Sequence, residues 1–302
     1  MLLSAPPQHP WSISHVALGV IETSAQNTPT LYYSPRDAQG RAHIARASLQ
    51  IRPDGALRVA AHDPDPVLSP GELGAFDDAG VTVSCVVEGE QGQGTLLYYT
   101  GWSLGVSVPF YFYAGLAVRR PGEERFERVS QAPILERNAV DPYLTASPWV
   151  LREQDGMWRM WYISCARWEM VADTPRHYYH VRYAHSEDGV HWQREGQVAL
   201  DFKDAQEYAM GRPCVERHAE GYRMWLCVRG ESYRLACASS PDGLRWTRED
   251  ERAELGGPAE AWDTEMQAYP AVFASGGTRY LLYNGNGYGR GGIGYALQRE
   301  DG

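Results

Sequence analysis

Polar, mostly acidic residues recur along the chain at intervals that could bring them to one place. They precede successive apolar segments at His15, Asp78, Asp141, Glu207 and Asp263, in steps of 63, 63, 66 and 56 residues. Carboxylates that converge repel one another, so at least one should have a raised pKa. Two carboxyl groups with divergent pKa values are what acid–base cleavage of a glycosidic bond requires. The spacing therefore favours a site in which these acids meet.

The elements that must position these residues repeat on the same interval. A short aromatic strand is predicted five times, and the steps between its third residues are 66, 63, 64 and 57. The five copies are 31–33, 97–99, 160–162, 224–226 and 281–283. An apolar run precedes each copy, at 16–21, 81–87, 147–151, 213–216 and 269–273. A strand of small residues follows each, at 43–45, 115–117, 182–184, 236–238 and 294–296.

Two of the units end in closely matched corners, Ser186–Trp192 and Ser240–Trp246. An Asp-Gly turn between strand-forming residues is a strong hairpin signal. The segments 53–55 and 121–122 mark the same corner in degraded form. The tryptophan beyond each Asp-Gly turn is predicted to pack its outer strand onto the neighbouring unit.

Each unit is thus four short strands over about 60 residues, without a helical period between them. Such units bury their faces only when they are arranged in a ring. The sequence predicts an all-β fold, a five-bladed β-propeller with four-stranded antiparallel blades, as one domain over residues 1–302. The last unit lacks an outer strand, which the segment before Trp11 is expected to supply, closing the ring. The first strand of each blade lines the channel, so the polar residues at its start would converge on one funnel.

This architecture and the succession Asp78, Asp141, Glu207 resemble the five-bladed glycosidases of glycoside hydrolase families 43, 32, 62 and 68. The corners and the segment 283–289 also resemble uncharacterised glycosidase-like propellers. The resemblance implies that Asp78 is the general base or nucleophile, Asp141 the residue that orients and tunes, and Glu207 the general acid. Adjacent acids remain alternatives, and each of these aspartates could instead be a turn-former that binds nearby backbone amides. The alternatives are Asp77 for the first position and Asp204 or Glu216 for the third.

Further residues are candidates for substrate binding in the funnel. The candidates are His15, Trp102, Trp168, Arg212, Asp263, Asn284, Asn286 and Tyr288. Arg212 could bind a carboxylate or phosphate of a ligand, or neutralise the acidic cluster. The aromatic loops 102–113 and 166–179 could form a carbohydrate-binding rim or an oligomer contact. A structural role is the alternative for His15 and for each tryptophan, and Glu265 competes with Asp263.

Composition narrows the classes of function. The formal charge is −10, from 28 Lys+Arg against 38 Asp+Glu. Such an acidic surface does not favour binding to nucleic acid, which depends mostly on cationic side chains that neutralise phosphates. No apolar stretch approaches the roughly 20 residues that cross a bilayer, and the N-terminus does not resemble a secretory signal. The five cysteines form no CxxC pair, and four of them are expected to be buried free thiols, which favours a cytoplasmic location. The histidines match no zinc pattern, so neither a metal nor a cofactor is expected.

Two main functions remain. The first is a glycoside hydrolase that acts on a small oligosaccharide or glycoside through the paired carboxylates. The second is a non-hydrolytic glycosidase-like propeller that binds a sugar or sugar nucleotide, or acts in glycoconjugate or natural-product biosynthesis. A third is an interaction scaffold. Because function depends on the site and not on the fold, the side chains that line the funnel must decide among them.

Overall fold

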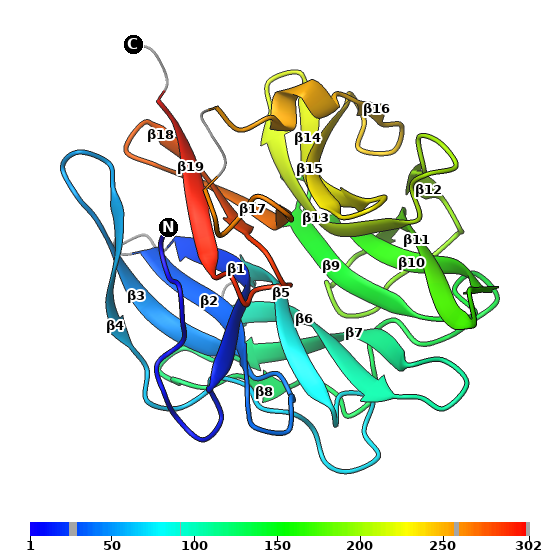
Figure 1. Cartoon of the computed structure of the whole chain (residues 1–302), viewed down its shortest axis with the longest axis horizontal. Helices are drawn as coiled ribbons and strands as arrows, with labels where there is room; N and C mark the ends of the chain where they lie inside the picture. Colours follow the sequence, from blue (N-terminus) through cyan, green and yellow to red (C-terminus); the bar gives the residue numbers. More distant parts are fainter. Residues whose placement is uncertain (24–28, 91, 257–259, 300–302) are drawn as a thin grey trace.

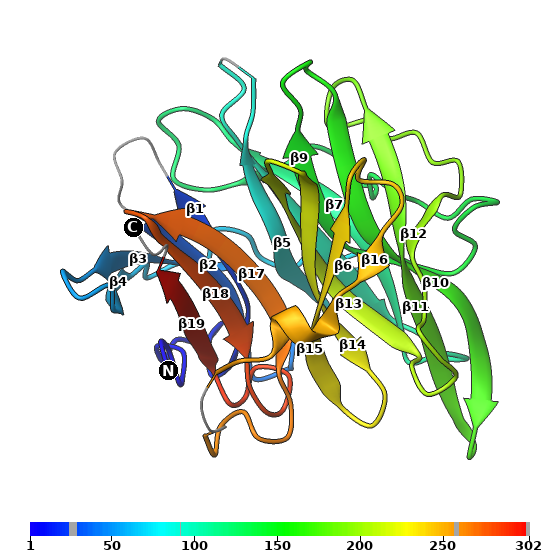
Figure 2. The same ribbon diagram turned by 90° about the horizontal axis from the view of Figure 1, so that it is seen from above.

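The computed structural model describes residues 1–23, 29–90, 92–256 and 260–299. In this part of the chain the regular structure is β-strand, apart from one short 3-10 turn, η1 (Asp250–Ala253). The strands form five consecutive antiparallel groups that surround a common centre (Figure 1). In the perpendicular view the strands run between two faces that carry the loops (Figure 2). The chain therefore has an all-β, propeller-type arrangement.

Consecutive strands are hydrogen-bonded neighbours in every group. The first group contains β1 (Ser14–Thr23), β2 (Pro29–Arg36), β3 (Ala45–Ile51) and β4 (Leu57–His62), and the second β5 (Gly80–Glu88), β6 (Thr95–Leu104), β7 (Phe110–Arg119) and β8 (Glu127–Arg128). The third contains β9 (Thr145–Arg152), β10 (Trp158–Val171), β11 (Thr174–Ser186) and β12 (Val198–Leu200). The fourth contains β13 (Ala209–His218), β14 (Gly221–Arg229), β15 (Tyr233–Ser240) and β16 (Thr247–Arg248), and the fifth β17 (Ala268–Ser275), β18 (Thr278–Asn284) and β19 (Ile293–Arg299). A parallel bridge from Tyr179 to Ala209 joins the third and fourth groups into one sheet.

The predicted aromatic strands are confirmed as the second strands of the groups, β2, β6, β10, β14 and β18. The preceding apolar runs are the first strands, β1, β5, β9, β13 and β17. The aromatic side chains are large and fully buried, as Tyr32, Tyr98 and Trp161 illustrate. Because each group exposes two apolar faces, these rings fill the space between neighbouring groups.

Three turn corners bind their groups to the preceding group. Three corner carbonyls accept hydrogen bonds from aromatic strands: Gly189 from Tyr98 (2.8 Å), Gly243 from Trp161 (2.8 Å) and Gly55 from Tyr280 (3.0 Å). The tryptophans beyond the two matched corners contact the same rings, with centroid distances of 6.2 Å for Trp192 on Tyr98 and 6.0 Å for Trp246 on Trp161. The prediction that these tryptophans pack onto the neighbouring unit is confirmed.

The first strands contact one another in cyclic order around the centre. β1 contacts β5, β5 contacts β9, β9 contacts β13, β13 contacts β17, and β17 contacts β1. The N-terminal segment reaches the fifth group, where Leu3 forms an antiparallel bridge with Ile293 of β19. The backbone N–H of Ile293 donates to the carbonyl of Leu3 at 2.9 Å.

All five cysteines are buried and unpaired, which confirms the prediction made for four of them. Burial raises the pKa of the Cys85 and Cys227 thiols to about 12, so both are protonated and unreactive at neutral pH. Within the described ranges, no helix has the length and apolar character needed to cross a membrane.

Candidate functional site

The centre of the molecule is shaped by irregularities in the first strands. Four of these strands shift register where a non-glycine residue has a positive φ: Leu18 (57°), Ser147 (47°), Arg212 (51°) and Tyr269 (57°). A β-bulge of this kind bends the strand and re-aims a side chain. Left-handed backbone in a non-glycine residue costs about 1–3 kcal/mol and is concentrated at functional sites. Leu18, Ser147 and Tyr269 all line the central cavity.

A short sequence pattern marks three of the bulges. A small residue, the bulged residue and a proline follow one another in 146–148, 211–213 and 268–270. Proline has no backbone N–H to give to a strand ladder, so within sheets it is found at edges and bulges. This pattern is a signal in the sequence that could have located the cavity walls.

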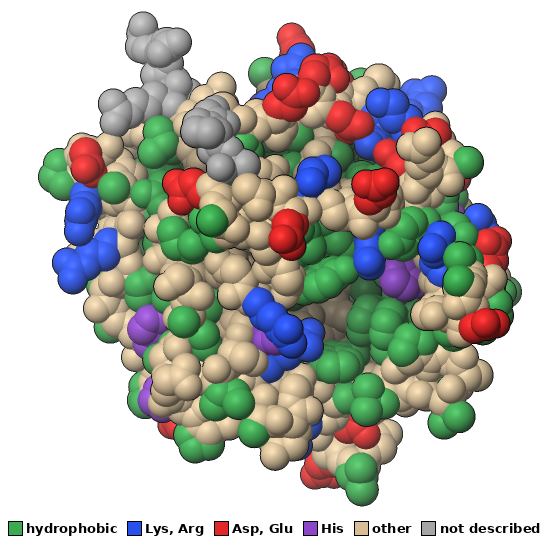
Figure 3. Space-filling model, viewed as in Figure 1, with side chains coloured by type: hydrophobic (Ala, Val, Ile, Leu, Met, Phe, Trp, Pro, Cys, Tyr) green, Lys and Arg blue, Asp and Glu red, His purple; other side chains and the backbone are tan. Residues whose placement is uncertain are grey.

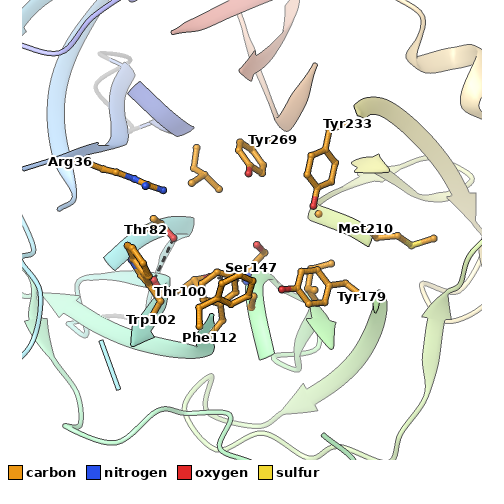
Figure 4. A pocket seen from close by; sticks show the side chains of 15 residues that line it. Arg36, Thr82, Thr100, Trp102, Phe112, Ser147, Tyr179, Met210, Tyr233 and Tyr269 are labelled. Carbon is orange, nitrogen blue, oxygen red and sulfur yellow. Dashed lines mark hydrogen bonds between the residues drawn. The ribbon is translucent and has the colours of Figure 1, made fainter. Parts of the chain in front are cut away.

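The bulges surround a cavity of about 370 Å³. In Figure 3 this face is hollowed near its middle, with hydrophobic side chains on the walls of the hollow and basic side chains on its border. The lining residues come from all five groups, as the labelled side chains in Figure 4 show. They are Leu18, Arg36, Thr82, Thr100, Trp102, Phe110, Phe112, Ala146, Ser147, Ile163, Tyr179, Met210, Gly211, Tyr233 and Tyr269. Among the described residues, the lining contains no aspartate or glutamate.

The polar groups of the cavity are few and well separated. The guanidinium of Arg36 lies 5.5 Å from the ring centroid of Trp102 and points toward the centre (Figure 4). The hydroxyl of Thr82 donates to the carbonyl of Thr100 at 3.4 Å. The hydroxyl of Tyr179 is buried and has no hydrogen-bond partner among the described residues. An apolar wall with a few oriented polar groups is typical of a small-molecule site, and the volume lies within the usual range of about 300–1,000 Å³.

Two histidines near the cavity have lowered pKa values, because they are buried and lie near arginines. Burial, together with Arg36 and Arg290, lowers the pKa of His15 to about 4. Burial, together with Arg229 and Arg176, lowers the pKa of His177 to about 4. Both imidazoles are therefore neutral at pH 7. His177 stacks on Tyr179, with centroids 4.0 Å apart, and so contacts a residue of the wall.

Arg212 lies among the inner strands and is only 1% exposed. Its guanidinium donates to the carbonyls of Val83 at 3.3 Å and Gly19 at 3.2 Å, and its Nε–H has no partner in the described ranges. Burial lowers the pKa of Arg212 to about 10, which leaves it charged at pH 7. No carboxylate of the described chain forms an ion pair with Arg212. The described residues therefore give no support to the interpretation that Arg212 neutralises an acidic cluster.

The structure places Asp141 in a buried network outside the cavity lining. The side chain is 0% exposed and accepts hydrogen bonds from Tyr162 (2.9 Å), Ser164 (2.6 Å), Arg182 (3.3 Å) and Arg194 (3.0 Å). These donors belong to β10, β11 and the segment beyond them. The carboxylate therefore ties together the strands of its own group.

The acids at 77 and 78 occupy different surroundings, and neither lines the central cavity. Asp77 is 1% exposed and accepts from Tyr99 at 3.1 Å and Arg128 at 2.9 Å, as Asp141 does from its own tyrosine and arginine. Asp78 is half-buried and accepts from the backbone N–H of Gly74 at 3.0 Å. The repeat of acids seen in the sequence thus coincides with a repeated Asp–Tyr contact.

Glu207 lies beside a different cavity, of about 590 Å³, between the fourth group and its neighbouring loops. Both of its oxygens accept from Arg248, at 3.1 and 3.2 Å, and one accepts from the backbone N–H of Lys203 at 2.7 Å. Arg248 also pairs with Asp250. The structure therefore does not bring Glu207 together with Asp78 and Asp141 at the central cavity.

Three of the predicted binding residues stabilise loops and strands. Asp263 is buried and accepts from Tyr283 at 2.8 Å, repeating the Asp–Tyr contact. Asn284 is fully buried and joins β18 to β1, since its Oδ1 accepts from the backbone of Leu18 at 2.8 Å. Asn286 accepts from two backbone N–H groups that precede β17.

The other predicted binding residues lie at or near the cavity. Trp102 forms part of its wall. Trp168 packs against Phe110 of the wall, with a centroid distance of 5.6 Å. Tyr288 is 40% exposed and meets Tyr233 edge-on at 6.3 Å. His15 lies within electrostatic reach of Arg36.

Sequence reasoning missed Arg36 and two tyrosines of the wall, Tyr233 and Tyr269, whereas Tyr179 ends the predicted aromatic loop 166–179. Arg36 follows the first aromatic strand, and the tyrosines are ordinary strand residues in sequence. The proline pattern could have found Tyr269, and no comparable signal marks the others. In the described ranges, no three His, Cys, Asp or Glu side chains gather as a metal site.

The arrangement of strands is that of glycoside hydrolases of known structure. One glycoside hydrolase has a TM-score of 0.74 at 17% identity, over 99% of this chain and 91% of that protein. A thermostable family-43 glycoside hydrolase has a TM-score of 0.65 at 12% identity, over 98% and 92% of the two chains. A member of the GH130 family of mannoside phosphorylases has a TM-score of 0.68 at 15% identity, over 96% and 85%. At these identities the likeness is one of fold, and the resemblance to glycosidase-like propellers is confirmed at that level.

Two full-length relatives come from Mycobacterium tuberculosis. Uncharacterized protein MT1551 of strain CDC 1551 / Oshkosh is 40% identical over 287 residues, which cover 95% of this chain and 93% of the relative. Uncharacterized protein Rv1502 of strain ATCC 25618 / H37Rv is 39% identical over the same lengths. The chain belongs to the family of these two proteins. No established family model matches it.

Proposed function

We propose that this protein is a glycosidase-like propeller whose central cavity binds a carbohydrate, and that it does not cleave its ligand with a pair of carboxylates in that cavity. The observation that carries this proposal is the lining: aromatic and apolar walls with one arginine and several hydroxyls, without an acid among the described lining residues. Hydrolysis by the usual mechanism needs two carboxyl groups, either about 5–5.5 Å or about 6.5–9.5 Å apart across the scissile bond. Trp102, Tyr233 and Tyr288 would stack on or hydrogen-bond the sugar.

The fold favours a second candidate, a glycoside hydrolase, because the structural neighbours include such enzymes. In that case Asp78, Asp141 and Glu207 would act as base, modulator and acid. Each of these carboxylates already accepts hydrogen bonds from protein groups away from the cavity lining. The binding function requires no rearrangement of those contacts, and it is therefore the function that the geometry supports better.

The experiment combines a binding assay with a turnover assay on the same preparation. Calorimetric titration with mono- and disaccharides tests binding, and a panel of aryl glycosides and short oligosaccharides tests hydrolysis. Binding without turnover, weakened about tenfold or more by Trp102→Ala, is the expected result. Trp11→Ala is the matched control, since Trp11 lies outside the cavity lining, stacked on His9.

Turnover that is lost in both Asp78→Asn and Glu207→Gln would overturn the binding function in favour of the hydrolase. Failure of folded protein to bind any of the sugars would contradict a carbohydrate site in the cavity.

We also infer that the five strand groups are the blades of a five-bladed propeller, closed between the fifth group and the N-terminus. The cyclic contacts of the first strands and the Leu3–Ile293 bridge support this closure. The hydrogen bond from Tyr280 to Gly55 supports it as well, since it repeats between the fifth and first groups the corner contact made elsewhere between consecutive groups. Deletion of residues 1–8 would then lower the melting temperature and loosen β19, measured by hydrogen exchange. Unchanged exchange in β19 would contradict closure by this segment.

A further inference from the structure

Three arginines near the cavity lack the acidic partners that most arginines of the described chain have. Arg41 pairs with Asp37 at 2.9 Å and Arg128 with Asp77 at 2.8 Å, and many more such pairs cover the described chain. By contrast, three arginines that border the cavity or act on the histidines beside it form no ion pair with any residue that the structure describes. The three are Arg36, Arg229 and Arg290. A protein with a formal charge of −10 therefore keeps positive charges without ion-pair partners near its central hollow.

Arg36 is the arginine on the wall itself. It is half-buried, lies against Trp102, and projects toward the cavity from the end of β2 (Figure 4). Burial, with Arg290 nearby, lowers the pKa of Arg36, so the charge is held at an energetic cost. A buried or half-buried charge is normally compensated by a partner. The guanidinium fork faces the space that a ligand would fill.

Arg229 lies beside Tyr233, a residue of the cavity wall. It lies 5.5 Å from the ring centroid of Tyr233, which lines the wall opposite Arg36, and 5.7 Å from that of Tyr288. Its Nε–H is buried without a hydrogen-bond partner in the described part of the chain. Stacking on tyrosine faces holds a guanidinium in place while its N–H edge stays available to an anion.

Two further groups bear on the ligand of the cavity, an unpartnered hydroxyl and a buried positive charge. Tyr179 is 6% exposed, and its hydroxyl, unpartnered within the described ranges, points into the cavity (Figure 4). Arg212 lies next to Gly211 of the cavity lining and carries a buried charge without a carboxylate partner among the described residues. In surroundings of low dielectric constant this charge adds to the positive potential in the hollow. Burial is the main cause of the low pKa values of His15 and His177, and Arg36 and Arg229 lower them further.

We propose that the ligand of the cavity is an anionic sugar, one that carries a carboxylate or phosphate group, that Arg36 on the wall binds the charged group, and that Arg229 adds to the positive potential that attracts it while the tyrosines contact the ring. This rests on the proposed carbohydrate-binding function and specifies its ligand class. Guanidinium groups form paired hydrogen bonds with either oxyanion, and such charge-assisted bonds are about twice as strong as neutral ones. An uncharged sugar would leave these charges without a partner.

The test compares matched sugars that differ in charge. Glucose and galactose are titrated calorimetrically beside glucuronate, galacturonate and the two hexose 6-phosphates, with inorganic phosphate as a bare anion. At least one charged sugar is expected to bind about tenfold or more tightly than its neutral parent, as one or two hydrogen bonds to a charged group imply. Whether the uronates or the phosphates bind identifies which oxyanion is the natural one.

Three variants assign the preference to residues. Arg36→Gln should abolish most of the advantage of the charged sugar and Arg229→Gln should reduce it, so that the affinity for the charged sugar falls by a larger factor than the affinity for its neutral parent. Arg36→Lys should restore part of the advantage, because the charge returns without the planar fork. Arg58→Gln is the matched control, since Arg58 is an exposed arginine on the outer strand β4. Far-UV circular dichroism and melting curves verify that each variant is folded.

Equal binding of charged and neutral sugars, or an equal loss for both in Arg36→Gln, would overturn the proposal and leave the carbohydrate-binding function standing. Failure to bind any sugar or phosphate would overturn both. A charge preference that Arg58→Gln reduces as much as Arg36→Gln would show a general electrostatic effect of the surface and would also refute the assignment to the cavity.

Discussion

Replacement of Asp141 by asparagine separates a structural role from a catalytic one. The carboxylate is fully buried and accepts from Tyr162, Ser164, Arg182 and Arg194. Arg194 is only 5% exposed, so the substitution leaves a buried positive charge without its partner. Loss of one member of a buried ion pair costs about 3–5 kcal/mol. The unfolding entropy of about 2.1 cal/mol/K per residue, over 302 residues, converts this into a fall of about 5–8 °C in melting temperature.

Calorimetric unfolding of Asp141→Asn and of the matched variant Asp78→Asn measures the effect. Asp78 is half-buried and has one backbone donor, so its replacement should lower the melting temperature by no more than about 1–2 °C. A catalytic carboxylate is commonly held at some cost to stability, and its replacement is then neutral or stabilising. If Asp141→Asn melts within about 1 °C of the unmodified protein, the buried network does not stabilise the fold.

Three further results are expected from single changes. Ser147→Gly should raise the melting temperature by about 1–3 °C, because glycine adopts the positive φ of 47° without strain; a lower melting temperature would show that the bulge is unstrained. Tyr280→Phe should lower the unfolding free energy by about 1 kcal/mol in a denaturant titration, since it deletes one hydrogen bond to the first group, and an unchanged midpoint would argue against that contact. Burial, Arg229 and Arg176 lower the pKa of His177 in the folded protein to about 4, below its unfolded value of about 6.5. The contribution of neutral His177 to the free energy of unfolding is therefore fully present above pH 6.5 and decreases as the pH falls toward 4. His177→Gln should reduce this slope by up to about 1.4 kcal/mol per pH unit, and an identical slope in both proteins would refute the assignment.

The sequence by itself determined the repeating unit. The aromatic strands, the apolar runs before them and the Asp-Gly corners are local patterns, and each depends on side chains that are close in the chain. The aromatic strand 97–99 and the corner at Ser186–Trp192 lie within two consecutive groups, and Trp192 packs on Tyr98 as predicted. Alternation, turn chemistry and aromatic burial were sufficient for this part of the fold.

Only the tertiary structure decided what lines the cavity. Asp141 and Asp263 belong to the regular series of acids and Asp77 is the neighbour of a third member, yet each accepts from a tyrosine of its own group, because a buried carboxylate is stabilised by the nearest donors. The lining comes from strands about 60 residues apart in all five groups, and a one-residue bulge decides which side chain faces inward. Arg36 and Tyr179 face one hollow because the strand groups are arranged around a common centre. Sequence spacing records the period of that arrangement, and the direction of each side chain depends on strand register and packing across the groups.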